Sequence, residues 1–153
     1  MNALLRVNHL VATFLGVGYS PVAPGTAGTF ATLPLYLLLR NLSLPRYLLS
    51  VSILAVLGVS AASRAESLWG KDPGKVVIDE VVGFLIALVS RPKGMRDVLT
   101  AFVLFRFFDV VKPPPARNLE ALPGGLGIMA DDVAAGAMSA LALAGIRKLS
   151  KRQ

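Results

Sequence analysis

The chain has 153 residues, of which 54% are hydrophobic and only 16% are charged, and its formal net charge is +7. This length is enough for a substantial core, so we expect a single domain over residues 1–153. The absence of cysteine excludes disulfides and thiolate chemistry. The basic residues are scattered at segment ends among few aromatic residues. This pattern does not form a nucleic-acid-binding strip and favours anionic membrane lipids as partners.

The first apolar segment, residues 3–18, predicts a helix, and it contains the only histidine of the chain, His9. A single histidine cannot support a histidine-based metal site, and the sequence offers no partner for a proton relay. We therefore interpret His9 as a structural or surface residue.

A segment rich in proline and glycine follows, and it ends just before another apolar segment. The prolines break the preceding helix, so its last residues are predicted at the N-terminus of the next helix. Free N–H groups and threonine hydroxyls at such a position suit a phosphate. The candidate phosphate-binding residues are Gly25, Thr26, Gly28 and Thr29. A plain threonine N-cap explains the same residues equally well.

Four further apolar segments cover residues 47–63, 76–90, 98–111 and 133–149. With the two N-terminal segments they predict an all-α fold, a compact bundle of about five to seven helices. The first of the four lies at the low end of the roughly 17–25 residues that a bilayer needs. Positive charges at both ends of the segments leave open whether the bundle spans the membrane or lies partly in one leaflet.

Five of the nine acidic residues lie inside or against apolar segments: Asp79, Glu80, Asp109, Asp131 and Asp132. Unpaired charges are costly in such surroundings and persist where they bind something. Glu80 has a longer reach than its neighbour Asp79, and we expect it to be a direct metal ligand. Asp131 and Asp132 stand where a helix is expected to begin, so helix capping is an alternative role for this pair.

The stretch from residue 105 to residue 132 combines carboxylates, a lysine and a glycine-rich loop. Asp109 and Lys112 precede three consecutive prolines, which places both near a helix C-terminus. The loop around Gly125 offers backbone N–H groups that can approach an anion. Together these groups predict an oxygen-rich cation site facing a phosphate. Arg106 shares a helix face with Asp109, so it either pairs with that carboxylate or binds phosphate.

Helices that alternate up and down would place these carboxylates in one layer. They come early in segments 76–90 and 133–149 and late in segment 98–111. Two functions use such a layer: a phosphatase that acts through a divalent cation, and a small membrane ion transporter with buried carboxylates as its cation path. The glycine loops and Lys112 favour the phosphatase, since a cation path needs no anion-binding groups.

Four strings occur in order along the chain: SPVAPGTAGTFATLP, VIDEVVGF, FRFFDVVKPPPAR and PGGLGIMADDVAAG. They closely resemble the phosphatidylglycerophosphatase A family and cover most of the chain, from about residue 20 to residue 136. The resemblance implies an all-α bacterial membrane enzyme that hydrolyses phosphatidylglycerophosphate to phosphatidylglycerol and inorganic phosphate with Mg²⁺. It also implies a place in the inner, cytoplasmic membrane, with the active site facing the cytoplasm.

The resemblance places four acidic residues and the Gly-Thr segment on family positions, and the role of each residue is our own hypothesis. We expect Mg²⁺ to be held by the residues on the family's acidic positions: Glu80, Asp109, Asp131 and Asp132. Asp79 or Asp131 is expected to orient or deprotonate the attacking water. Lys112 and the Gly-Thr segment would neutralise phosphate oxygens, with Arg106 and Gly125 as further phosphate contacts. A phospho-aspartyl intermediate is the alternative to direct attack by water.

Overall fold

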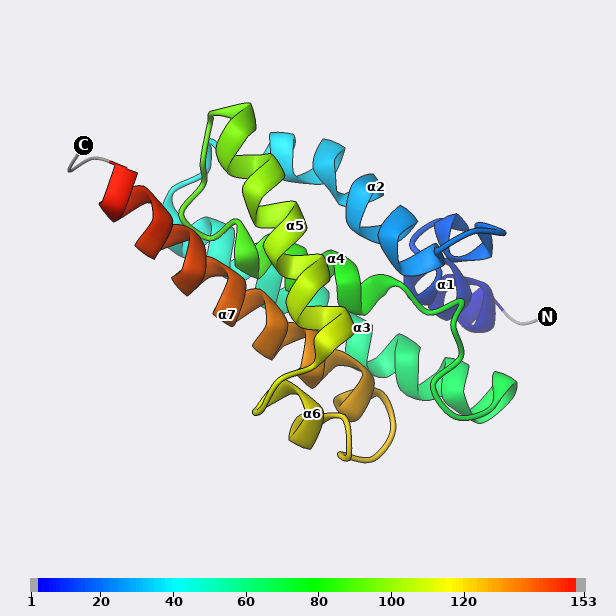
Figure 1. Ribbon diagram of the computed structural model, residues 1–153. Coiled ribbons are helices and arrows are strands. Elements are labelled where there is room, and N and C mark those ends of the chain that lie inside the picture. The colour runs from blue at the N-terminus through cyan, green and yellow to red at the C-terminus, as the bar shows by residue number, and fades with distance from the viewer. Residues whose placement is uncertain (1–2, 151–153) are drawn as a thin grey trace.

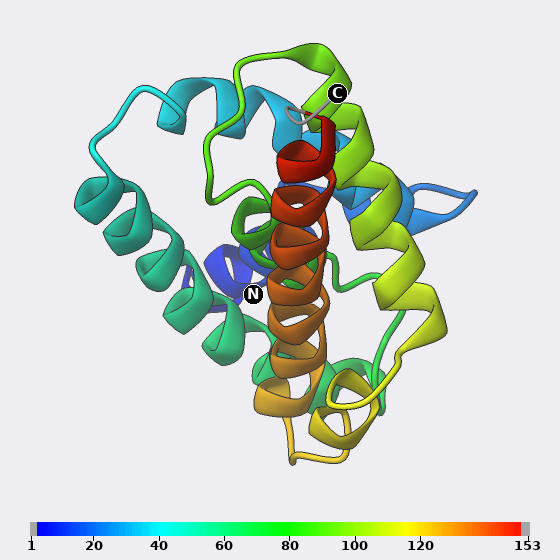
Figure 2. The ribbon, with the colours of Figure 1, turned by 60° about the vertical axis from the view of Figure 1, so that its left-hand side comes forward.

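The computed structural model describes residues 3–150 and contains, within this range, seven α-helices, one 3₁₀ turn and no strand. The predicted all-α bundle is therefore confirmed. The helices are α1 (Ala3–Ala12), α2 (Pro24–Leu39), α3 (Leu44–Trp69), α4 (Ile78–Ala87), α5 (Met95–Val111), α6 (Ala116–Leu119) and α7 (Gly125–Ser150), and the 3₁₀ turn is η1 (Val17–Tyr19). Figures 1 and 2 show α2, α3, α5 and α7 arranged around α4.

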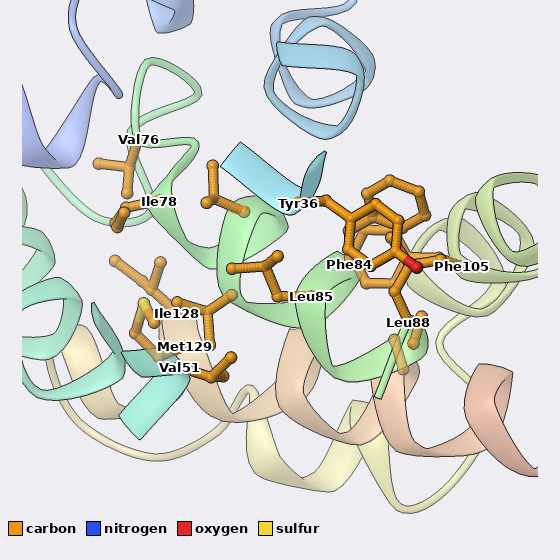
Figure 3. Packing of buried hydrophobic residues seen from close by; sticks show 14 of the residues in the cluster. Tyr36, Val51, Val76, Ile78, Phe84, Leu85, Leu88, Phe105, Ile128 and Met129 are labelled. Carbon is orange, nitrogen blue, oxygen red and sulfur yellow. The ribbon is translucent and has the colours of Figure 1, made fainter. Parts of the chain in front are cut away.

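Helix α4 is the centre of the bundle. All of its residues are buried except Asp79, Glu80 and Ile86. A helix that is apolar on every side is stable only when other elements cover every side. In Figure 3, Phe84 and Leu85 lie within a cluster that draws side chains from α2, α3, α5 and α7. The two carboxylates at the start of α4 are therefore carried on the most enclosed helix of the bundle.

Two glycines let α4 and α7 approach each other closely. A Cβ atom on Gly136 would lie 2.2 Å from the carbonyl oxygen of Gly83, and one on Gly83 would lie 2.7 Å from the carbonyl oxygen of Asp132. Such distances leave no room for a side chain, so only glycine permits this backbone contact. Because Glu80 lies about one turn before Gly83, the contact brings Asp132 next to the carboxylates at the start of α4.

The N-terminal helix ends earlier than the sequence predicts. Helix α1 stops at Ala12, and the chain then leaves the helical region, with a φ angle of 93° at Gly16. Gly18 packs against the backbone of Lys75, where a Cβ atom would lie 1.9 Å from the carbonyl oxygen. The prediction of one helix over residues 3–18 was wrong because this tertiary contact overrides the local helix propensity.

Helices α3 and α7 are each 26 residues long and apolar enough to cross a membrane, which indicates membrane association. They differ in how far the bundle covers them: 28% of the most apolar part of α3 is buried, against 56% for α7. Helix α3, which contains the predicted segment 47–63, therefore turns most of its apolar surface outward. Its exposed large side chains include Leu48, Leu49, Ile53, Val56 and Leu57.

Candidate active site

A cavity of about 900 Å³ lies at the end of the bundle where α2, α4 and α7 begin. Eight of the nine acidic residues of the chain line it, together with four basic residues. The acidic residues are Glu66, Asp72, Asp79, Glu80, Asp109, Glu120, Asp131 and Asp132, and the basic ones are Lys71, Arg106, Lys112 and Arg117. In a chain with a net charge of +7, almost all the negative charge is thus gathered in one place.

Three carboxylates form the most compact group in this cavity. Asp79, Glu80 and Asp132 each offer one oxygen atom, and these atoms all lie within 4.8 Å of one another. Each of the three side chains also has a buried oxygen with no hydrogen-bond partner among the described residues. Buried carboxylate oxygens without donors are costly unless a cation satisfies them. The group therefore fits a hard divalent cation, for which carboxylate oxygens are the preferred protein ligands.

The two α4 carboxyls resist ionisation in the absence of a cation. Burial raises the pKa of Asp79 well above its usual range, and the neighbouring Glu80 and Asp132 raise it further. Burial also raises the pKa of Glu80; Asp109 adds to this effect, while the hydrogen bond from Asp79 and the charge of Arg106 oppose it. A bound divalent cation would lower both pKa values, because it stabilises the ionised carboxylates.

Arg106 pairs with carboxylates, the first of the two roles that the sequence left open, and phosphate binding by Arg106 stays a prediction. Its Nη1 atom lies 2.6 Å from Oδ2 of Asp109 and 3.8 Å from Oε1 of Glu80. The same nitrogen donates a hydrogen bond of 3.4 Å to Oγ1 of Thr29. Arg106 is thus fixed at the edge of the carboxylate group, and it offsets part of the negative charge there.

Lys112 stands at the end of α5 in the left-handed conformation, with a φ angle of 46°, just before the three prolines. Its Nζ atom donates a hydrogen bond of 2.7 Å to Oδ2 of Asp131 and lies 3.0 Å from Oε1 of Glu120. Burial alone would lower the pKa of Lys112, but the bonds to these two carboxylates raise it, so the ammonium stays charged. Asp131 is therefore primarily the partner of Lys112, and it lies outside the compact group of three carboxylates.

The Gly-Thr segment lies at a helix N-terminus, as the sequence predicts, but only its first glycine reaches the cavity. Gly25 lines the cavity, and a Cβ atom there would lie 2.1 Å from Oε1 of Glu80, so the glycine makes room for that carboxylate. Thr26, Gly28 and Thr29 are not among the residues that line the cavity. Gly28 packs on Val77, and the Thr29 hydroxyl donates to the carbonyl of Gly25. The segment does lie at a helix N-terminus as predicted, but it forms the first turns of α2.

The glycine segment before α7 also differs from the prediction of a free loop. Gly125 is the first residue of α7, and its N–H donates a hydrogen bond of 2.9 Å to the Ser63 hydroxyl, so it is not available to a phosphate. A Cβ atom on Gly125 would lie 2.2 Å from the carbonyl oxygen of Val59, which shows that the glycine serves close packing on α3. Asp131 and Asp132 lie in the second turn of α7, so the helix-capping interpretation of this pair was wrong.

Several cavity residues escaped the sequence analysis. They are Glu66, Lys71, Asp72, Arg117 and Glu120. All are charged residues outside the apolar segments, where a solvated surface role is the ordinary expectation. The one signal that could have found them is the scarcity of acidic residues: with only nine in the chain, each deserved consideration as part of one cluster.

A family model described as Phosphatidylglycerophosphatase A matches residues 10–147. The chain belongs to the phosphatidylglycerophosphatase A family. Two relatives with this name, from Escherichia coli K12 and Haemophilus influenzae, are 38% and 39% identical; the matches cover 86% and 87% of this chain and 78% and 84% of theirs. A Bacteroides thetaiotaomicron protein provisionally named phosphatidylinositol-3-phosphatase is 44% identical over 88% of this chain and 90% of its own. No solved structure matches the chain.

Membership in this family identifies the chain as a phosphatase, which decides between the two functions that the carboxylate layer allowed. The ion-transporter alternative is set aside. The relatives come from bacteria, in agreement with the bacterial origin that the resemblance implies.

Proposed function

We propose that this enzyme hydrolyses the terminal phosphomonoester of phosphatidylglycerophosphate to give phosphatidylglycerol and inorganic phosphate. The observation that carries the proposal is the convergence of three carboxylates with Lys112 and Arg106 in a single cavity. Family membership and the names of the Escherichia coli and Haemophilus influenzae relatives support this substrate.

We propose Mg²⁺ as the cofactor, held by Asp79, Glu80 and Asp132. One oxygen from each lies within 4.8 Å of the others, each side chain has a buried oxygen without a hydrogen-bond partner, and Asp109 lines the same cavity. A bound divalent cation would supply positive charge to polarise the phosphoryl group. In this proposal Asp131 orients Lys112 and is not a metal ligand, which modifies the expectation from the sequence.

The protein groups would then act on the phosphate and on the attacking water. Lys112, held by Asp131 and Glu120, would neutralise charge on the phosphate oxygens. Asp79 lies beside the proposed cation, where a carboxylate oxygen that does not hold the cation would orient the attacking water and accept its proton. The water oxygen forms the new bond to phosphorus, the bond from phosphorus to the glycerol oxygen breaks, and that oxygen is protonated as it leaves.

The substrate enters from a membrane in this proposal. The exposed apolar surface of α3 and the length of α3 and α7 suit a bilayer, and the cavity lies at the end of both helices where a headgroup would be found. We propose that this end faces the cytoplasm at the bacterial inner membrane, with anionic lipids around it. A direct test is protease or label accessibility of the α3–α4 connection in inside-out and right-side-out vesicles.

Phosphate release from phosphatidylglycerophosphate, measured with and without Mg²⁺, tests the activity. The wild-type protein is expected to release phosphate only with the metal, and Asp132→Asn is expected to be inactive. The name of the Bacteroides thetaiotaomicron relative points to a second substrate, phosphatidylinositol 3-phosphate. The value of kcat/KM should therefore be measured for both lipids. No hydrolysis of phosphatidylglycerophosphate, or equal rates with a metal chelator present, would contradict the proposal.

Trapping labelled phosphate on the protein during turnover would show a phospho-aspartyl intermediate in place of direct attack by water.

A further inference from the structure

The four basic residues of the cavity fall into two pairs. Arg106 and Lys112 contact carboxylates, at 2.6 Å from Asp109 and 2.7 Å from Asp131. Lys71 and Arg117 form no ion pair with any carboxylate among the described residues. Two basic residues of the cavity are therefore paired with carboxylates of the protein, and two are not.

The two unpaired basic residues, Lys71 and Arg117, lie at the mouth of the cavity. Lys71 lies in the α3–α4 connection and Arg117 lies on α6, and both residues are exposed, whereas Asp131 and Asp132 are buried. Figures 1 and 2 show α6 and this connection at the same end of the bundle as the start of α7. The cavity thus has buried carboxylates at its floor, and its exposed rim carries the unpaired Lys71 and Arg117 beside two acidic residues, Asp72 and Glu120, of which Glu120 pairs with Lys112.

A lipid that carries two phosphates matches this arrangement. Phosphatidylglycerophosphate has a phosphomonoester at the end of its headgroup and a phosphodiester between the headgroup and the diacylglycerol. Phosphatidylinositol 3-phosphate has the same two groups on a different polyol. If the monoester lies at the carboxylate floor, the diester is left nearer the membrane, where it needs a cationic partner.

We propose that Arg117 and Lys71 form a subsite for the phosphodiester of the lipid substrate. The inference rests on the proposed function, because it assigns the monoester to the carboxylate floor. A guanidinium can donate two parallel hydrogen bonds to the two free oxygens of a phosphodiester, and an ammonium adds a point charge. The subsite makes the enzyme select lipids with a phosphodiester and explains how headgroups as different as glycerol and inositol can share one cavity.

Binding of a short-chain product lipid tests the subsite without turnover. Dihexanoyl phosphatidylglycerol carries the phosphodiester and lacks the monoester, and its binding should raise the melting temperature of the wild-type protein. We expect Arg117→Gln to weaken this binding about tenfold and Lys71→Gln about threefold, as losses of charge-assisted hydrogen bonds at an exposed site. Arg117→Lys should recover part of the loss. Dihexanoylglycerol, which has the same acyl chains and no phosphodiester, should bind all variants alike.

Arg64→Gln is the matched control, because Arg64 is an exposed cation near the end of α3 that does not line the cavity. It should bind the product lipid within about twofold of wild type. Equal weakening by Arg64→Gln and Arg117→Gln would reduce the effect to net charge and overturn the proposal. So would unchanged binding in the double variant Arg117→Gln/Lys71→Gln, or no binding of the product lipid by the wild type.

Turnover separates the subsite from the proposed function. With phosphatidylglycerophosphate, Arg117→Gln is expected to raise KM about tenfold, and the constant for inhibition by inorganic phosphate, which probes the carboxylate floor, should change less than about twofold. Absence of hydrolysis by the wild type would defeat the proposed function while the binding result still decides on the subsite. Normal hydrolysis with an unchanged KM in Arg117→Gln and in Lys71→Gln would contradict the subsite and leave the proposed function standing.

Discussion

The two ends of the bundle differ in the sign of their charged residues. At the cavity end, eight acidic residues gather around four basic ones, and several carboxylate oxygens have no partner. At the opposite end, where α2, α4 and α7 finish and α3 and α5 begin, the only acidic residue within the described range 3–150 is Asp97, which accepts hydrogen bonds of 2.8 and 2.6 Å from Arg147. The basic residues there are Arg40, Arg46, Arg91, Lys93, Arg96, Arg147 and Lys148.

Helix direction accounts for part of this difference. The N-termini of α2, α4 and α7 meet at the cavity end, where their partial positive charge favours anions, and their C-termini meet at the opposite end, where cations are favoured. At the opposite end the cations complement helix C-termini and the one acidic residue is paired, and the atoms without a partner are nitrogens, Nε of Arg40 and of Arg91. At the cavity end the negative charge exceeds what the helix ends and cations can offset. That excess marks the end where the protein binds something.

Asp132→Asn should produce the largest effect, because it removes a charged oxygen from the group of three carboxylates that is proposed to hold the cation. We expect kcat/KM for phosphatidylglycerophosphate to fall about 10³-fold or more, comparable to the loss of a main transition-state contact. Measurement of phosphate release with saturating Mg²⁺ checks this. Retention of more than a tenth of wild-type activity would show that the site is built around other groups.

Two glycine substitutions contrast the two ends directly. In Gly25→Ala the new methyl group would collide with Oε1 of Glu80, and we expect about a 10²-fold loss of kcat/KM from the displaced carboxylate. Gly145→Ala, near the C-terminus of α7, meets no atom within 4 Å and should stabilise the protein by about 0.5–1 kcal/mol with unchanged activity. Assays of activity and melting temperature on both variants check the pair. Equal activity in the two would contradict the close approach of Gly25 to Glu80.

The free energy of unfolding should depend on pH because of the carboxyl groups at the cavity end. Burial raises the pKa of Asp79 and of Glu80, so the folded protein binds protons more tightly than the unfolded chain. The free energy of unfolding of the metal-free protein should therefore fall as the pH rises above about 4, the usual carboxyl range, towards the raised pKa values. Mg²⁺ should restore it, so the melting-temperature difference with and without Mg²⁺ should grow with pH. Asp79→Asn should raise the metal-free melting temperature at neutral pH; a lower one would show that the Asp79 charge is already compensated.

The smallest effect is expected at the opposite end. Asp97→Asn removes the carboxylate that Arg147 contacts, and both side chains are about one-third exposed. A partly solvated pair of this kind contributes about 1 kcal/mol or less. Chemical denaturation should show a loss within that limit, and phosphate release should stay within about twofold of wild type. A large loss of activity in Asp97→Asn would mean that the two ends are coupled.

Local patterns in the sequence were enough to predict the helices and the main carboxylates. The apolar segments gave the all-α bundle, and the three prolines placed Lys112 at a helix end, as the structure has it. The cost of burying Asp79, Glu80 and Asp132 marked them before any contact was known. The all-α bundle and the helix end at Lys112 were predicted correctly because each depends on neighbours along the chain.

Assignments that depend on packing were the ones that failed. The sequence could not tell that Gly125 packs on α3, or that Gly25 makes room for a carboxylate, because both roles depend on distant segments. It also could not separate Asp131, which pairs with Lys112, from its neighbour Asp132. Adjacent helical residues point about 100° apart, and only the packing of α7 on α4 decides which one faces the cluster.

The amino-acid sequence by itself determined that this chain forms apolar helices carrying a few buried acidic groups, because hydrophobic periodicity and the cost of burying charge are local properties. The tertiary structure decided which of those acids lie together, which basic residues are already paired, and which glycines permit the contacts. Those outcomes depend on how closely helices such as α4 and α7 approach, and that distance is set by backbone contacts between residues far apart in the chain.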